Sequence, residues 1–300
     1  MKIGLALGAG AARGWTHLGI IEALENLGIQ IDVVSGCSIG AYVGAAYASG
    51  NLTQLKDWAF DLTEWEVLRL LGIGFTRSGL ASGEQVFKRL ADDFSVTTFE
   101  EMQRPFAIPA TDLYSGREII FQSGPVVDAV RASCSIPALF APVQFENRWL
   151  VDGAVVNPVP VNLCRLMGAD FVIAVNLSAD FRPEMIDKNI TAHENAQRKT
   201  DEKLEKQQSI FRNWFSPDPN DNQQTPPGIM SVMSNSLDIM QARVTRSRLA
   251  GDPPDILIEP NLRDVGILEF EKAEELYAVG KEAVERLEKQ ILYQLSYLNG

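Results

Sequence analysis

The sequence predicts an α/β protein in which a central, mostly parallel sheet carries helices on both faces. Two observations predict this class. Within the first fifty residues, short apolar segments typical of strands alternate with segments of helical character. Farther along, a strand buried on both faces is predicted at residues 171–176, because residues 171–175 form a continuous apolar run.

The amino-terminal fifty residues supply the first strand–helix units. Their first helix is indicated by Ile20, Leu24 and Leu27, which recur at helical spacing on one face before a terminating glycine. In order, the predicted elements are a strand at 3–7, a loop of small residues at 8–14, a helix ending at Gly28, a strand at 31–35 and a helix at 38–49.

The rest of the chain continues the alternation, with one change of character. Helices are predicted at 84–90, 128–132, 229–250 and 268–292, and strands at 106–110, 118–122, 148–151, 171–176 and 255–259. Residues 182–227 are charged and rich in Gln, Asn and Pro. We therefore expect one domain over residues 1–300 that carries a polar, mobile insertion at about 182–227.

Composition excludes several classes of protein. The chain has 300 residues and a net charge of −12, which argues against a nucleic-acid partner because phosphates favour basic surfaces. Its three cysteines have no metal-ligand spacing, so neither a disulfide framework nor a metal site is predicted. No targeting signal or membrane span is evident. We expect a soluble, cytoplasmic protein.

The loop at residues 8–14 is a candidate anion site. Small residues there allow backbone N–H groups to surround a negative charge at the start of a helix. Gly8 and Gly10 after a strand, with Asp32 farther on, also suggest a dinucleotide-binding loop. Arg13 stands where that pattern needs a third glycine, so the dinucleotide alternative is weak.

Residues 36–40, Gly-Cys-Ser-Ile-Gly, form a G-x-S-x-G motif between a strand and a helix. In this context the motif is typical of a nucleophile elbow, where a sharp turn presents the serine, here Ser38. The alternative is an ordinary turn in which Ser38 caps a helix.

The base that would activate Ser38 is hard to find among the histidines. The chain has only two, His17 near the first helix and His193 inside the polar insertion. Asp152 is the better candidate, because it ends a strand and two small residues follow it, and the ends of parallel strands converge on a ligand crevice. Asp112 and Asp32 are rivals, although each also suits a turn. An Asx-turn is the structural alternative for Asp152 itself.

Taken together and in this order, the motifs resemble the patatin-like phospholipase family, in particular its bacterial, neuropathy-target-esterase-like branch. The resemblance rests on residues 8–14, 36–40 and 152–154 and covers residues 1 to about 178. Residues 131–137 (Arg-Ala-Ser-Cys-Ser-Ile-Pro) and 157–160 (Asn-Pro-Val-Pro) also resemble the family.

The resemblance implies a three-layer fold and a serine acyl hydrolase that cleaves lipid or small acyl esters without a metal or other cofactor. It implies a Ser–Asp dyad of Ser38 as nucleophile and Asp152 as base, with an oxyanion hole in the first loop. The implied oxyanion residues are Gly10, Ala11 and Arg13, and the supporting glycines are Gly8, Gly14, Gly36, Gly40 and Gly153.

Two features leave alternatives open. Ala9 and Ala11 stand where the family typically has glycine, and an alanine would be strained at any position with positive φ. The alternative function is therefore a weakly catalytic or non-catalytic regulatory or binding protein on the same fold. Within the insertion, Phe211, Trp214 and Phe215 are either a lid or membrane-contacting anchor, or a flap packed on the domain surface. The oligomeric state is not predicted.

Overall fold

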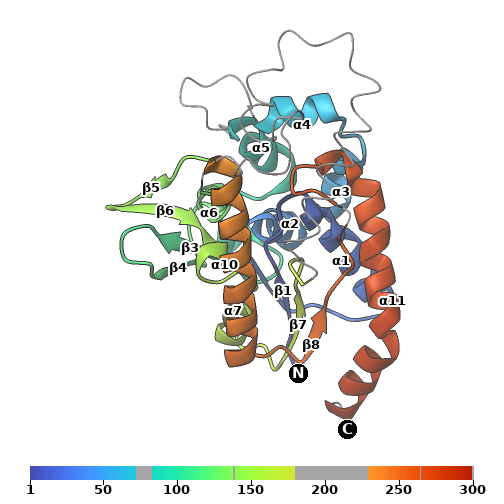
Figure 1. Cartoon of the computed structure of the whole chain (residues 1–300). Helices are drawn as coiled ribbons and strands as arrows, with labels where there is room; N and C mark the ends of the chain where they lie inside the picture. The colour runs from blue at the N-terminus through green and yellow to red at the C-terminus, as the bar shows by residue number, and fades with distance from the viewer. Residues whose placement is uncertain (72–82, 138, 180–228, 264, 299–300) are drawn as a thin grey trace, which may run out of the picture.

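The computed structural model describes residues 1–71, 83–137, 139–179, 229–263 and 265–298, and it forms a mixed eight-stranded sheet with helices on both faces (Figure 1). The strands are β1 (Ile3–Leu7), β2 (Val33–Gly36), β3 (Phe106–Asp112), β4 (Glu118–Phe121), β5 (Val143–Phe145), β6 (Arg148–Asp152), β7 (Phe171–Val175) and β8 (Ile256–Ile258). The α-helices are α1 (Thr16–Asn26), α2 (Ile39–Ala48), α3 (Leu52–Phe60), α4 (Glu64–Leu71), α5 (Glu84–Arg89), α6 (Val126–Ser133), α7 (Val161–Leu166), α10 (Ile229–Gly251) and α11 (Ala273–Leu298).

Short helical turns extend or precede several of these elements. They are the 3₁₀ turns η1 (Ala11–Trp15), η3 (Phe99–Glu101), η4 (Gly153–Val155) and η5 (Phe270–Lys272) and the π-helical turn η2 (Leu90–Phe94).

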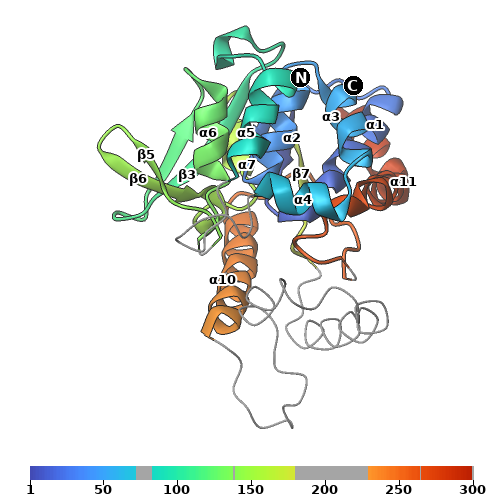
Figure 2. The ribbon, with the colours of Figure 1, turned by 90° about the horizontal axis from the view of Figure 1, so that it is seen from above.

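The sheet has a parallel part and an antiparallel part that meet at β3. Its strand order is β5-β6-β3-β2-β1-β7-β8, with β4 pairing β3 outside this path. Strands β1, β2, β3, β7 and β8 pair in parallel, whereas β4 and β6 pair antiparallel with β3, and β5 with β6. Seen from above, the β5–β6 hairpin projects from one side, and α1, α3 and α11 gather on the other (Figure 2).

Each face of the sheet has its own apolar layer. Alternate residues of β1 point to opposite faces, as the period of a strand requires. Leu5 and Leu7 belong to the large core that includes α1, α2, α6 and α11. Ala6 belongs to a smaller cluster with Cys164 of α7, against which Leu249 of α10 packs. The three-layer α/β arrangement predicted from sequence is therefore confirmed.

The structure differs from the predicted elements in several places. The last helix begins at Ala273, because residues 265–270 form a strap with a turn in it, and carbonyl oxygens of this strap accept hydrogen bonds from Ala12, Arg13 and Trp15. Helices α3, α4 and α7 and the short strand β5 were not predicted. The predicted insertion at 182–227 lies outside the described residues. Among the helices that are described, none is long and apolar enough to cross a membrane.

Candidate active site

Ser38 lies in a sharp turn between β2 and α2, as the G-x-S-x-G motif predicts. Its backbone has φ 56° and ψ −124°, a conformation that a residue with a side chain rarely adopts. The turn requires glycine on either side, since a Cβ on Gly36 would lie 2.2 Å from the Gly40 carbonyl oxygen, and one on Gly40 would lie 2.2 Å from the Leu7 carbonyl oxygen. Ser133 of α6 holds the turn by accepting the Ser38 N–H at 2.9 Å.

Asp152 faces Ser38 from the end of β6. The Ser38 hydroxyl donates to Asp152 Oδ2 at 2.7 Å, and both side chains are buried, each 3% exposed. The expectation that Asp152 ends a parallel strand is wrong, because β6 runs antiparallel to β3. The strand pairing brings Asp152 to the serine. Ser35 of β2 pairs with Ala107 of β3, so Ser38, three residues farther on, comes level with Ala110, the residue that pairs with Asp152.

The carboxylate of Asp152 is held by the backbone around it. Its Oδ1 accepts the Ala154 N–H at 2.8 Å, its own N–H donates to the Ser135 carbonyl oxygen, and its carbonyl oxygen accepts the Thr111 hydroxyl at 2.9 Å. Gly153 allows close approach to β3, because a Cβ there would lie 2.3 Å from the Pro109 carbonyl oxygen. The predicted Asx-type bond to Ala154 therefore coexists with the contact to Ser38.

Burial raises the pKa of Asp152 to about 7, against the lowering effect of the hydrogen bonds from Ala154 and Ser38. A carboxylate normally binds a proton far too weakly to remove one from a serine. Raising its pKa toward neutrality reduces this mismatch while leaving a large ionised fraction at pH 7 and above. The site therefore contains a serine hydroxyl hydrogen-bonded to a carboxylate of unusually high proton affinity.

The loop at residues 8–14 lies beside Ser38 and has unused backbone donors. The N–H groups of Gly8, Ala9, Ala12 and Arg13 donate to backbone carbonyl oxygens. In the described part of the chain, no hydrogen bond uses the N–H of Gly10, Ala11 or Ile39. Of the predicted oxyanion residues, Gly10 and Ala11 therefore keep free donors, whereas the Arg13 N–H is taken by the Gly10 carbonyl oxygen at 3.2 Å.

Arg13 contributes through its side chain and joins the loop to the strap at residues 265–270. Its Nε donates to the Val265 carbonyl oxygen at 2.9 Å, and the Ala12 N–H donates to that of Ile267 at 3.0 Å. The indole N–H of Trp15 completes the attachment by donating to the Phe270 carbonyl oxygen. The predicted supporting glycines at the two ends of the loop are also closely packed: Gly8 lies against β7 and Gly14 against Ile39.

The two alanines that stand where the family typically has glycine, Ala9 and Ala11, differ in backbone strain. Ala11 has φ 49°, in the left-handed region that glycine occupies readily and alanine does not. Ala9 has no positive φ, and its side chain is buried in a small cluster with Cys37 and Ala154. The strain expected for alanine in this loop therefore falls on Ala11 alone.

We expect Ala11→Gly and Ala9→Gly to change stability in opposite directions. Ala11→Gly relieves about 1–2 kcal/mol of backbone strain, partly offset by the greater freedom of glycine in the unfolded chain, so a net gain of up to about 1 kcal/mol is expected. Ala9→Gly relieves no strain. It increases the conformational freedom of the unfolded chain and removes a buried methyl group, so we expect its free energy of unfolding to fall by about 1 kcal/mol. Urea denaturation of both variants measures the two signs. A loss of stability in Ala11→Gly would contradict the assignment of strain.

His17 supports the loop and lies outside the hydrogen-bonded pair. It is fully buried, and its Nε2 bonds the Gly8 carbonyl oxygen at 2.8 Å. Burial lowers its pKa to about 4, so the ring is neutral at physiological pH and Nε2 carries the donated hydrogen. His193 lies outside the described residues.

The rival aspartates have structural roles at a distance from Ser38. Asp32 accepts the Ile3 N–H at the start of β1, and Asp112 accepts the N–H groups of Tyr114 and Ser115 in the β3–β4 turn. The hairpin role predicted for Asp112 is confirmed. In the described residues, no group of three or more His, Cys, Asp or Glu side chains is arranged to hold a metal ion.

Three residues of the site were not predicted from sequence. Ser133 and Thr111 hold the backbones of Ser38 and Asp152. Ser133 lies within the family-like residues 131–137, although no role was assigned to it, and Thr111 carries no signal beyond a hydroxyl in an apolar strand. Ile39 was missed although the motif offers a clue, because the N–H after an elbow nucleophile commonly stabilises an oxyanion.

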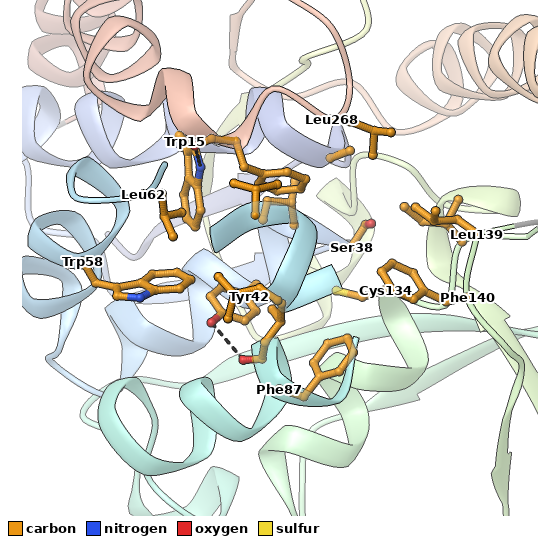
Figure 3. Close-up of a pocket in the computed structure, with 17 residues that line it drawn as sticks. Trp15, Ser38, Tyr42, Trp58, Leu62, Phe87, Cys134, Leu139, Phe140 and Leu268 are labelled. Atoms are coloured by element: carbon orange, nitrogen blue, oxygen red, sulfur yellow. Dashed lines mark hydrogen bonds between the residues drawn. The ribbon is translucent and has the colours of Figure 1, made fainter. Parts of the chain in front are cut away.

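An apolar pocket opens beside Ser38 (Figure 3). Ala11, Ser38 and Ile39 line it together with aromatic side chains such as Trp15, Tyr42 and Phe87. Cys134 borders it near Ser38, and burial raises the pKa of this thiol well above its usual range, so it is a neutral wall residue. A carbonyl at Ser38 would thus have free N–H groups on one side and an apolar cavity next to it.

Comparisons with known proteins found one family model, curated relatives and solved structures. The family model described as Patatin-like phospholipase matches residues 5–165. An uncharacterized NTE family protein from Mycobacterium tuberculosis (strain H37Rv) is 31% identical over 93% of this chain and 89% of its own length. The lysophospholipase nte1 of Aspergillus fumigatus is 29% identical over 96% of this chain, which spans only 18% of that protein. The crystal structure of VipD from Legionella pneumophila matches with a TM-score of 0.39 and 13% identity over 99% of this chain and 76% of that one.

Proposed function

The chain belongs to the patatin-like phospholipase family, a family of lipid acyl hydrolases, and from that premise we propose that it cleaves lipid acyl esters with Ser38 as nucleophile and Asp152 as base. The observation that carries this proposal is the 2.7 Å hydrogen bond from the Ser38 hydroxyl to the Asp152 carboxylate, at a buried turn beside an apolar pocket.

The first half of the reaction forms an acyl-enzyme. Ser38 Oγ attacks the ester carbonyl carbon while its proton passes to Asp152 Oδ2. The carbonyl electron pair moves onto oxygen, and this oxyanion accepts hydrogen bonds from Gly10 and Ala11, with Ile39 as a third candidate donor. Collapse of the intermediate breaks the bond to the alcohol, which leaves with the proton from Asp152.

The second half returns the enzyme to its starting state. Water attacks the acyl-enzyme and gives a proton to Asp152, and the same donors stabilise the second oxyanion. Collapse then breaks the bond to Ser38, releases the fatty acid and returns the proton from Asp152 to the serine. Each loop donor is worth about 2.7–4 kcal/mol of barrier in comparable sites, so the loop is as necessary as the dyad.

A fluorophosphonate probe tests this proposal directly, because it reacts only with an activated serine. We expect the wild-type protein to be labelled at Ser38, as located by peptide mass spectrometry, and Ser38→Ala to remain unlabelled. A screen of lysophospholipids, phospholipids and nitrophenyl esters then identifies the substrate class. A folded but unlabelled wild-type protein would instead favour the regulatory or binding role, for which the strained Ala11 is the motivating feature.

The rate should depend on pH through the ionisation of Asp152. Only the ionised carboxylate can accept the serine proton, and its pKa is raised to about 7. We therefore expect kcat/KM for a nitrophenyl ester to fall about tenfold per pH unit below pH 7 and to level off above it. A pH–rate profile from 5 to 9, corrected for spontaneous hydrolysis, measures this. A flat profile between pH 5 and 8 would contradict Asp152 as the base.

The proposed reaction also indicates which molecules the protein contacts. A lipid or small acyl ester is the proposed substrate, and contact with a lipid surface would supply it. Phe211, Trp214 and Phe215, the predicted membrane-contacting residues, lie outside the described residues, so their role stays a prediction, as does the cytoplasmic location.

A further inference from the structure

The pocket beside Ser38 extends away from the serine. In Figure 3, Ser38 and Phe140 lie at one end, Tyr42 lies farther in, and Trp58 and Leu62 lie at the opposite end. An ester carbonyl held at Ser38 would therefore direct one of its two substituents along this cavity.

The lining of the pocket decides which substituent enters. No charged side chain lines it among the described residues. The Tyr42 hydroxyl donates to the Val86 carbonyl oxygen at 3.2 Å, and the Trp15 indole N–H donates to that of Phe270 at 3.0 Å. Because both groups are already bonded to the protein, a polar glycerol or phosphate would lose its hydration without gaining partners. The acyl chain, which gains from leaving water, fits this lining.

Packed side chains line the far end of the pocket. Trp58 of α3 meets Trp15 edge-on, with ring centroids 6.1 Å apart, and contacts Phe94 at 5.3 Å. Leu62 beside it is only 7% exposed. Rings held from two sides cannot move aside without losing these contacts, so they limit how far a chain can extend.

We propose that this pocket binds the acyl chain of the scissile ester and that Trp58, with Leu62, sets the greatest chain length that it accepts. The proposal rests on the proposed function, since it assigns the acyl part of the substrate to this cavity. It makes Trp58 a specificity-determining residue that touches the substrate and takes no part in proton transfer.

A series of nitrophenyl esters from acetate to palmitate tests the wild-type protein. Each methylene that enters the pocket raises kcat/KM by about fourfold, because its burial lowers the barrier. We expect this rise to stop at one chain length and the rate to fall for longer chains, in assays below the micelle-forming concentration of each ester.

Variants at the far end should move this limit. We expect Trp58→Ala to shift the optimum to a chain at least two methylenes longer, and Trp58→Phe and Leu62→Ala to shift it by less. For each variant, the rates of the longer esters are divided by its own rate with the acetate ester, whose chain does not reach the far end, so that the optimum is read from the shape of the series. Trp65→Ala is the matched control: Trp65 is 69% exposed on the neighbouring helix α4 and does not line the pocket.

The outcomes separate this proposal from the proposed function. If Ser38 is labelled and the esters are cleaved, but the rate rises through palmitate without a break, the length limit does not exist. An unchanged optimum in folded Trp58→Ala and Leu62→Ala would assign the limit to other residues and also overturn the proposal. Absence of Ser38 labelling in the wild-type protein would instead overturn the proposed function.

Discussion

Asp152→Asn should lower kcat/KM by about 10³-fold or more and at the same time stabilise the fold at alkaline pH. The loss of activity follows because a neutral amide cannot accept the Ser38 proton. Asparagine has nearly the shape of aspartate, so its oxygen can keep the bond from the Ala154 N–H while its amide donates to Ser38 Oγ. The effect is therefore expected on chemistry, without loss of structure.

The gain in stability comes from removing a buried charge. The pKa of Asp152 is 3.8 in the unfolded chain and about 7 in the folded protein. Protonation of this group therefore stabilises the fold fully below pH 3.8, and that contribution, roughly 4 kcal/mol, is lost as pH rises through 7. The asparagine variant has no such loss. We therefore expect its free energy of unfolding to exceed that of wild type by roughly 1–3 kcal/mol at pH 8.5 and by little at pH 5.

Urea denaturation of wild type and Asp152→Asn at both pH values measures this difference, and nitrophenyl-ester turnover measures the activity. Glu118→Gln is a suitable control, since it also replaces a carboxylate of the antiparallel part but leaves the serine contact intact. Near wild-type turnover in folded Asp152→Asn would exclude Asp152 as the base. A stability difference that does not grow with pH would show that the buried carboxylate is not the cause.

Ser38→Ala and Ser38→Gly should both lower turnover by about 10⁴-fold or more, because each removes the nucleophile. They should differ in stability. Alanine keeps a Cβ at φ 56° and ψ −124°, a conformation that costs about 1–3 kcal/mol, whereas glycine adopts it without that cost. The greater conformational entropy of glycine in the unfolded chain offsets part of this difference. We therefore expect the free energy of unfolding of Ser38→Gly to exceed that of Ser38→Ala by about 1 kcal/mol.

The comparison between the two variants isolates backbone strain, because both lose the same hydroxyl and the same bond to Asp152. Thermal and urea denaturation at pH 7 provide the measurement, with fluorophosphonate labelling as the check that neither variant reacts. If Ser38→Gly proved less stable than Ser38→Ala, the turn would not be strained at this residue. Substantial turnover by either variant would mean that another group performs the nucleophilic attack.

Those features of the site that depend on neighbouring residues in the chain could be predicted from the sequence. Glycines flanking Ser38 between a strand and a helix predict the turn, because only small residues allow such close backbone approach. The small residues after Asp152 point to the carboxylate that the structure places against Ser38, although the expected parallel direction of its strand is wrong. The antiparallel direction of β6 depends on long-range pairing with β3, and no local pattern encodes it.

The residues that hold the site from distant parts of the chain could not be predicted either, because their contacts also depend on long-range packing. Residues 268–272 continue the apolar spacing of the last helix, and the sequence therefore predicts them within it. In the structure they form a turn and the 3₁₀ turn η5, and the Phe270 carbonyl oxygen accepts the Trp15 indole N–H. Tertiary contacts override local propensity there. Ser133 likewise sits among apolar helix residues, and only the fold shows that its hydroxyl accepts the Ser38 N–H.

The strap at residues 265–270 has a consequence for the timing of activity during synthesis. Its contacts to Arg13 and Trp15 join residues 252 and 255 positions apart in the chain. A ribosome adds about 5–20 residues per second, so the loop, Ser38 and Asp152 all leave it well before the carbonyls that tie down the loop. The emerging chain therefore passes several seconds with Ser38 and Asp152 already made but without the bonds from the strap to Ala12, Arg13 and Trp15. We expect the proposed hydrolysis to reach its full rate only when the carboxyl-terminal segment docks.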